Sequence, residues 1–264
     1  MRTYVWLGPL ALLGACTDVP SEPPLDRVDL RRAIGAEQVD PVGVAIAANG
    51  ARYVLDEQRG LYRLEGESAT AIVPMANLPP PAEPIRLPVT DLVALAPDVF
   101  ALTAIGDGFL LDTSALTLTQ HFCYEPEGFS SGLVQRTDAL TFDAEADRIY
   151  AQPVTYDQDG RFQNSQLAVY DRDTGTDIAW HDLDDSVAAT GMTLIPDVGL
   201  VLGQGSRLLR FDAASARTVP GEDLARFGVR SIDGLVVDAT HGTLVVVDGD
   251  TNELVEIELA QLAL

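Results

Sequence analysis

Lysine is missing from this chain of 264 residues, and its 17 basic residues are all arginine. Chemistry that needs a lysine amine, such as a P-loop or a pyridoxal Schiff base, is therefore excluded. Positive charge is scarce as a whole, because 40 acidic residues leave a formal net charge of -23. This balance argues against a nucleic-acid partner, whose phosphates need basic neutralisation, and against electrostatic adsorption to anionic lipid head groups.

Cysteine is also scarce, since the chain has two, Cys16 and Cys123. Cys16 ends the letters LGAC, which follow Arg2 and an almost wholly apolar run over residues 4–13. About ten apolar residues are too few for a permanent bilayer-spanning helix, which needs about twenty. One positive charge, an apolar run, small residues and then a thiol together resemble the lipobox of bacterial lipoprotein precursors. The alternative is an apolar first strand with a chance cysteine.

The lipoprotein resemblance implies a signal peptide over residues 1–15 and lipidation of Cys16 after cleavage. Several acyl chains on one residue would anchor the protein firmly to a membrane. By the rule known for enterobacterial lipoproteins, Thr17 after the cysteine implies the outer membrane, with the protein facing the periplasm or the cell surface. Residues 16–26 are acidic and rich in proline, which predicts an extended tether. Cys123 is then left without a disulfide partner in the chain.

From about residue 40 onward the sequence repeats. Each repeat has an apolar strand, a turn with Asp, Asn, Gly or Pro, and a second apolar strand, and the starts are about 43 to 52 residues apart, as in four-stranded propeller blades. The aligned segments are Val42–Leu55, Asp91–Ala104, Asp138–Ala151, Thr190–Gly203 and Asp233–Val246. Helical periodicity is confined to Arg27–Glu37 and Leu259–Leu264. The sequence predicts an all-β propeller of five, or alternatively six, four-stranded blades over residues 27–264.

The last repeat lacks an outer strand before the chain ends. A stretch within Asp26–Val39 is expected to supply that strand from the N-terminal side and to close the ring, which removes exposed sheet edges. The linker over residues 77–88 has no assigned place, and an irregular sixth blade is the alternative it leaves open.

Two repeats carry a resemblance in their letters. Ile232–Asp238, Gly242–Asp248 and Asn252–Ile257 resemble a blade of the NHL, gluconolactonase-like and YVTN group of propellers, and Leu167–Gly175 is similar to the third strand and turn of YVTN-type repeats. The resemblance implies the fold but no single activity. A gluconolactonase-like relative would hold a divalent metal with a Glu, an Asn and an Asp. The first repeat offers only Asp40 near its start, so that metal site is not carried over.

Aspartate recurs where the first strand of a repeat starts. Asp91, Asp138 and Asp233 align there, with Thr190 and Val42 in the two other repeats. Because first strands line the axis of a propeller, these side chains are expected to ring one mouth of the channel. Neighbouring carboxylates there would attract a cation or a basic ligand and raise one another's proton affinity. The alternative is that each aspartate caps a local turn.

Two long loops, residues 123–136 and 152–166, are expected on the same face as the aspartate ring. Loops on a rigid scaffold often carry binding residues, although solvated excursions are equally compatible with these segments. The candidate contact residues are Tyr124, Phe129, Tyr156, Asp157, Asp159, Arg161 and Phe162.

No complete catalytic or metal motif occurs. Residues 128–132, GFSSG, have the letters of a nucleophile elbow without its strand-turn-helix context. Residues 157–160 and 248–253 match a calcium loop only in part, so hairpin turns explain them, with a weak ion between Asp248 and Asp250 as the alternative. His121 and Cys123 share one face of a strand but lack further zinc ligands. No catalytic residue and no cofactor is predicted, with a divalent cation such as calcium as the alternative.

The patterns together favour a lipid-anchored propeller of the bacterial cell envelope that acts as a binding or scaffolding module for a protein or a small ligand. The alternative function is a metal-dependent hydrolase or lactonase that uses a carboxylate at the channel mouth. Enzymatic activity is the less favoured of the two.

Overall fold

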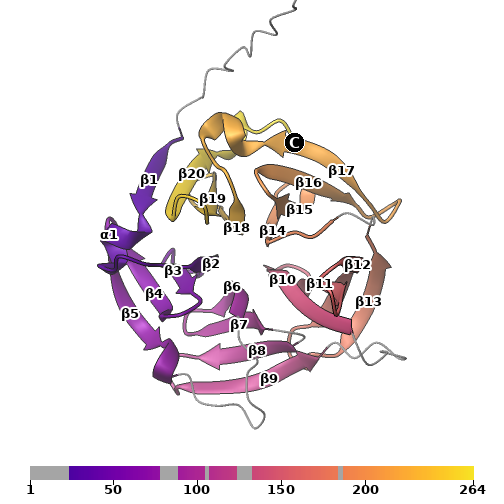
Figure 1. Cartoon of the computed structure of the whole chain (residues 1–264), viewed down its shortest axis with the longest axis horizontal. Coiled ribbons are helices and arrows are strands. Elements are labelled where there is room, and N and C mark those ends of the chain that lie inside the picture. Colours follow the sequence, from indigo (N-terminus) through magenta and orange to yellow (C-terminus); the bar gives the residue numbers. More distant parts are fainter. Residues whose placement is uncertain (1–23, 78–88, 105–106, 124–132, 184–186) are drawn as a thin grey trace, which may run out of the picture.

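The computed structural model describes residues 24–77, 89–104, 107–123, 133–183 and 187–264. Five four-stranded antiparallel sheets stand around a central axis, each with its first strand nearest the centre (Figure 1). The predicted all-β class and the count of five blades are confirmed, and the six-bladed alternative is wrong. The predicted signal peptide, Cys16 and the tether up to residue 23 lie outside the described residues.

Blades 1 to 4 are each continuous in the sequence and run outward from the first strand to the fourth. Blade 1 is β2 (Pro41–Ile46), β3 (Arg52–Asp56), β4 (Gly60–Glu65) and β5 (Ser68–Pro74). Blade 2 is β6 (Val89–Ala96), β7 (Val99–Ala104), β8 (Asp107–Asp112) and β9 (Thr117–Cys123). Blade 3 is β10 (Leu133–Asp143), β11 (Arg148–Asp157), β12 (Phe162–Asp171) and β13 (Asp177–Asp182). Blade 4 is β14 (Gly191–Ile195), β15 (Gly199–Gln204), β16 (Arg207–Asp212) and β17 (Arg217–Asp223).

Blade 5 closes the ring by combining the two ends of the chain. β18 (Ile232–Asp238), β19 (Thr243–Asp248) and β20 (Glu253–Glu258) come from the C-terminal end, and β1 (Asp26–Asp29) pairs antiparallel with β20. The guanidinium of Arg27 also donates to Glu253 and, at 2.6 Å, to the carbonyl oxygen of Phe227. The prediction that an N-terminal stretch supplies the missing outer strand is confirmed.

The helices are shorter than the helical periodicity of the sequence predicts. Within the predicted helix 27–37, residues up to Asp29 belong to β1, and α1 covers only Leu30–Ile34. Pairing with β20 satisfies the backbone groups of β1, so the strand prevails over a weak helical pattern. Among the described residues, the other helical segments are one-turn 3-10 helices, η1 (Met75–Asn77), η2 (Leu224–Phe227) and η3 (Leu259–Gln261). In the part of the chain that the structure describes, no helix is long and apolar enough to span a bilayer.

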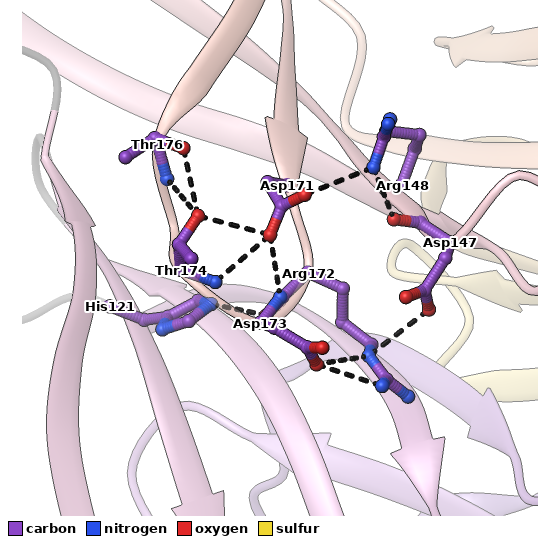
Figure 2. A network of polar contacts seen from close by, with 8 residues as sticks. All are labelled: His121, Asp147, Arg148, Asp171, Arg172, Asp173, Thr174 and Thr176. Atoms are coloured by element: carbon purple, nitrogen blue, oxygen red, sulfur yellow. Dashed lines mark hydrogen bonds and ion pairs between the residues drawn. The ribbon is translucent and has the colours of Figure 1, made fainter.

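A network of polar contacts holds the turn that follows β12 in blade 3, and one of its bonds reaches blade 2 (Figure 2). The carboxylate of Asp171 accepts the N–H and the hydroxyl of Thr174, both at 3.0 Å, and pairs with Arg148 at 3.1 Å. The carbonyl oxygen of Arg172 lies 2.6 Å from Nε2 of His121 on β9. The segment predicted as a third strand and turn is therefore confirmed as one, and its turn contacts blade 2 through His121.

Candidate functional site

In four of the five blades, a β-bulge near the start of the first strand turns one side chain toward the axis. The register between first and second strands slips by one residue at Val42, Thr90, Asp138 and Asp233. In blade 4 the corresponding residue is Thr190, which immediately precedes β14 and whose N–H donates to the carbonyl of Gly203 at 2.9 Å. A bulge re-aims the residue that it leaves unpaired. These five side chains line a single cavity of about 280 Å³ at one mouth of the propeller.

Asp91 is not part of this ring, and its predicted place there is wrong by one residue. Thr90 lines the cavity instead, while Asp91 is 2% exposed. Its two carboxylate oxygens accept the N–H groups of Leu92 and Leu140, each at 2.7 Å, so it connects β6 to β10 of the next blade. Burial raises the pKa of Asp91 well above its usual value, and the two N–H donors oppose that rise. The aspartate letters align between repeats, but the bulge decides which residue faces the axis.

Hydrogen bonds between neighbouring first strands hold the mouth in place. The hydroxyl of Thr90 donates to the carbonyl of Thr137, and the hydroxyl of Thr190 donates to that of Ile232. The strands also approach closely, since a Cβ on Gly43 would lie 2.8 Å from the backbone nitrogen of Leu92. The lining threonines are thus held by the backbone of neighbouring strands rather than by loop residues, which favours a preformed site.

The cavity lining is mainly acidic and hydroxylic. Beyond the ring it contains Glu57, Val89, Arg136 and Tyr156. Nε of Arg136 donates to Oδ1 of Asp138 at 3.0 Å, and this is the only cation of the lining within the described residues. Burial raises the pKa of Asp138, and the charge and hydrogen bond of Arg136 oppose the rise. Burial also raises the pKa of Tyr156, and the negative charge of Asp138 adds to that effect.

Asp233 is a carboxyl group of the lining whose pKa is raised toward neutral pH. Burial, with smaller contributions from the nearby carboxylates of Asp248 and Asp250, raises its pKa to about 6 against the opposing hydrogen bond from Ser231. That hydrogen bond, from the Ser231 hydroxyl to Oδ1, is 3.0 Å long. Burial likewise raises the pKa of Glu57. The mouth therefore holds carboxyl groups whose negative charge is costly and which a cation would stabilise.

Buried polar residues behind the mouth position the chain as it enters the first strands. Asp56 accepts the N–H of Asp40 at 2.7 Å, and Asp248 accepts the N–H groups of Arg230 and Ser231 at 3.1 Å. Both carboxylates are completely buried. The carboxylate of Asp248 therefore caps the segment that enters β18, while the predicted hairpin over residues 248–253 is present because Asp248 of β19 pairs with Glu253 of β20.

Gln152 has the same role between blades 3 and 4. Its Oε1 accepts the N–H of Ala189 at 2.9 Å, and its Nε2 donates to the carbonyl of Val187 at 3.0 Å. The sequence alone does not show that Gln152 and Asp56 hold neighbouring segments in place, because their hydrogen-bond partners lie in other segments. The one sequence signal for such a role is the aspartate that ends the second strand in both blade 1 and blade 5.

The predicted loop 152–166 is instead a long two-stranded hairpin. β11 and β12 extend through it and leave only residues 158–161 as a turn. Its polar side chains suggested a loop, but pairing between the two strands satisfies their backbone regardless of side-chain polarity. Leu133 at the start of β10 pairs with Asp157, so the tip does lie at the mouth end, as predicted.

Most candidate residues of this hairpin lie outside the cavity lining. Tyr156 lines the cavity and contacts Phe162 edge to face, with ring centroids 6.3 Å apart. Asp157 accepts the N–H groups of Asp159 and Arg161 at 2.9 and 2.8 Å and so caps the turn. Asp159 and Arg161 form an exposed ion pair at 3.2 Å. Of the five predicted contact residues in this hairpin, only Tyr156 lines the cavity, and the other four lie outside its lining.

Three other predicted features, Tyr124, Phe129 and the GFSSG segment, lie outside the described residues. Among the residues that are described, no group of three or more His, Cys, Asp or Glu side chains is arranged to hold a metal ion. The described lining of the mouth also contains no asparagine, so the Glu, Asn and Asp ligand set of a gluconolactonase-like metal centre is incomplete there.

No protein-family model matches the sequence, and no curated protein matches it. Solved structures do match: a gluconolactonase from Xanthomonas campestris is 12% identical over 84% of this chain and 73% of its own, with a TM-score of 0.52. A luciferin-regenerating enzyme is 12% identical over 90% of this chain and 78% of its own, with a TM-score of 0.54. A chain of a mitotic checkpoint complex is 9% identical over 98% and 99%, with a TM-score of 0.47. At this identity, the likeness to the gluconolactonase and to the luciferin-regenerating enzyme shows the fold alone.

Proposed function

We propose that the protein is a binding module whose propeller mouth takes a small ligand with an ammonium or guanidinium group. The observation that carries the proposal is the 280 Å³ cavity ringed by all five blades, with Asp138 and Asp233 in its lining. This volume is near the lower end of small-molecule sites, which span roughly 300–1,000 Å³. The net charge of -23 would draw a cation toward the mouth.

Calorimetric titration with n-butylammonium and with agmatine tests the proposal. Changing Asp138 and Asp233 together to Asn is expected to weaken binding about tenfold or more, because both anionic partners are lost. Asp159→Asn is the matched control, since Asp159 is exposed at the same end and outside the lining. Arg136→Gln is expected to strengthen binding by removing the competing cation. Equal affinities for all four proteins, or no saturable binding to any, would remove the mouth as a cation site.

The proposal includes attachment to the bacterial outer membrane through lipidated Cys16. It is supported by the sequence order of Arg2, an apolar run and LGAC, and by the start of β1 at Asp26, which leaves about ten residues after Cys16 as a tether. Labelling with an alkyne analogue of palmitate should mark the wild-type chain, whereas Cys16→Ser should remain unlabelled and leave the membrane fraction. Equal labelling of both would contradict the anchor.

A metal-dependent hydrolase is the second candidate, favoured by the fold shared with a gluconolactonase and by the raised pKa of Asp233. The described residues do not assemble its ligand set. Titration with calcium, magnesium, manganese and zinc separates the two candidates. Stoichiometric metal binding together with lactone hydrolysis would favour the enzyme. If the protein shows neither metal binding nor hydrolysis, the binding module is the candidate that remains.

A further inference from the structure

The seams between blades differ in how the chain fills them. Blades of a propeller diverge outward, so each seam needs large side chains or extra elements to reach the close packing of a protein interior. Between blades 1 and 2, Tyr53 and Phe100 meet edge to face at 4.8 Å. Between blades 2 and 3, Phe122 stacks on Tyr170 at 4.4 Å with Trp180 against it.

The two seams of blade 5 are filled by elements outside the strands. Phe227 of η2 is 1% exposed and packs in the cluster between blades 4 and 5. Leu30 and Ala33 of α1 fill the seam between blades 5 and 1. Four of the five seams are thus completed by rings or by a short helix from the chain itself.

In the part of the chain that the structure describes, the seam between blades 3 and 4 has a buried inner part but no buried ring. Leu167, Met192 and Leu202 fill the inner part together with Ala139 and Ala189. The rings of this seam, Tyr150 and Phe211, are only half-buried. A cavity of about 580 Å³ remains there, about twice the volume of the mouth cavity. We call it the blade 3–4 cleft; its apolar walls are Tyr150, Leu167, Val169, Leu194, Leu200 and Phe211.

The blade 3–4 cleft lies at the end of the propeller opposite the mouth. Val198 in the β14–β15 turn and Ala213 and Ala214 in the β16–β17 turn line it. The mouth is formed at the other end of the same strands, where Thr190 precedes β14. A molecule in one cavity therefore does not occupy the other.

The polar side chains of the cleft offset one another. Arg210 and Asp212 both line it, and the charge of Arg210 helps to lower the pKa of Asp212, whose main stabilisation is the hydrogen bond from Ser215. The ring of His181 contacts that of Phe211 with centroids 5.8 Å apart. A lining with apolar walls, aromatic rings and balanced charge discriminates against an ionised ligand.

We propose that the blade 3–4 cleft binds a small uncharged aromatic molecule, whose ring completes this seam as side-chain rings complete the neighbouring ones. The volume lies within the range of small-molecule sites, roughly 300–1,000 Å³. The ring stacks against Phe211 and His181, and aromatic pairs prefer such offset or edge contacts. This site is independent of the cation site proposed for the mouth.

Indole serves as the probe, titrated into the full chain and followed by saturation-transfer NMR and calorimetry. Saturable binding is expected to the wild type. Leu194→Trp places an indole ring into the cleft from β14, and it is expected to weaken indole binding about tenfold or more while keeping the thermal midpoint. The matched control is Ile178→Trp, a substitution at a 49% exposed residue of β13 outside the cleft, which should bind as the wild type does.

Phe211→Leu keeps an apolar wall but removes the ring, so it is expected to weaken indole binding about threefold or more. If the Leu194→Trp protein fails to fold, the Phe211→Leu protein still tests whether indole binds in the blade 3–4 cleft. Absence of saturable indole binding to the wild type, or unchanged affinity in the folded Phe211→Leu protein, would overturn the proposal. The double change of Asp138 and Asp233 to Asn should leave indole binding intact, so failure of either site is distinguishable from failure of the other.

Discussion

At the scale of single residues, the carboxyl groups near the mouth are held in different ways. Asp138 is paired with Arg136, Asp233 has a serine hydroxyl as its hydrogen-bond donor, and Asp91 is sealed between blades by two backbone donors. The same residue type therefore serves as a candidate ligand contact in two places and as a structural link in the third.

The charge of Asp233 is expected to destabilise the folded protein. Its pKa rises from 3.8 to about 6 on folding, so the unfolded chain releases this proton more readily. The cost is absent well below pH 4, grows as pH rises toward 6 and is complete above it. Asp233→Asn should therefore stabilise the protein at pH 8 by about 1 kcal/mol, a value that allows for solvent screening, and by almost nothing at pH 3.5.

Urea unfolding at these two pH values measures that difference. Asp159→Asn removes one negative charge from an exposed side chain and is the control for net charge. A stabilisation by Asp233→Asn that is equal at both pH values, or a loss of stability at pH 8, would contradict the expected pH dependence.

Asp91→Asn is expected to destabilise the protein by about 1–3 kcal/mol. An amide keeps one acceptor oxygen but turns its NH₂ toward the second backbone donor, so either Leu92 or Leu140 loses its partner in a buried seam. Chemical denaturation measures the loss. Binding of n-butylammonium to the folded protein should change less than about twofold, because Asp91 is outside the cavity lining. A large loss of n-butylammonium binding with little loss of stability would mean that Asp91 belongs to the ligand-binding ring after all.

At the scale of elements, β1 has more effect on the ring than its length suggests. It is four residues long, yet it covers the outer edge of β20 and begins the segment that leads into α1. Val28 is 8% exposed and lies in the same apolar cluster as Leu30, Val54 and Val245, which joins blades 5 and 1. The strand thus contributes both a sheet edge and part of a seam.

Two truncated chains test the role of β1. A chain that starts at residue 24 is expected to unfold cooperatively, because every described strand is retained. A chain that starts at Leu30 should lose cooperative unfolding or aggregate, since β20 becomes an open edge beside an exposed apolar seam. Thermal melts and size-exclusion chromatography compare them. Equal midpoints and elution volumes would mean that β1 is dispensable for closure.

At the scale of the whole molecule, the ring is held by seams and strand ladders under strong self-repulsion. A net charge of -23 on a chain with pI about 4.2 opposes the compact state at neutral pH. Interblade links such as the bonds of Arg52 to Glu256 and, at 3.0 Å, to Asp238 offset part of that repulsion locally.

Salt should therefore stabilise this protein. Raising NaCl from about 10 mM to about 300 mM shortens the screening length severalfold, so the thermal midpoint is expected to rise by about 5 °C. KCl at equal ionic strength is the control and should give the same shift if screening is the cause. A falling midpoint would mean that attractive ion pairs outweigh the general repulsion.

The repeat pattern by itself determined the fold class and a closing strand from within Asp26–Val39, whereas the structure decided between five and six blades. Each blade is a local unit with period-two apolar residues and turn signals, so its strands can be recognised from neighbouring letters. The mouth end of the β11–β12 hairpin followed from the same connectivity.

Only the tertiary structure decided which side chains meet. A one-residue bulge exchanges the faces of a strand, and no pattern in the letters distinguished Thr90 from Asp91 as the residue that faces the axis. Arg136, Glu57 and the open seam beside Phe211 likewise depend on contacts between blades distant in sequence. Periodicity reports local hydrogen bonding and burial, whereas a cavity is set by how separate units pack.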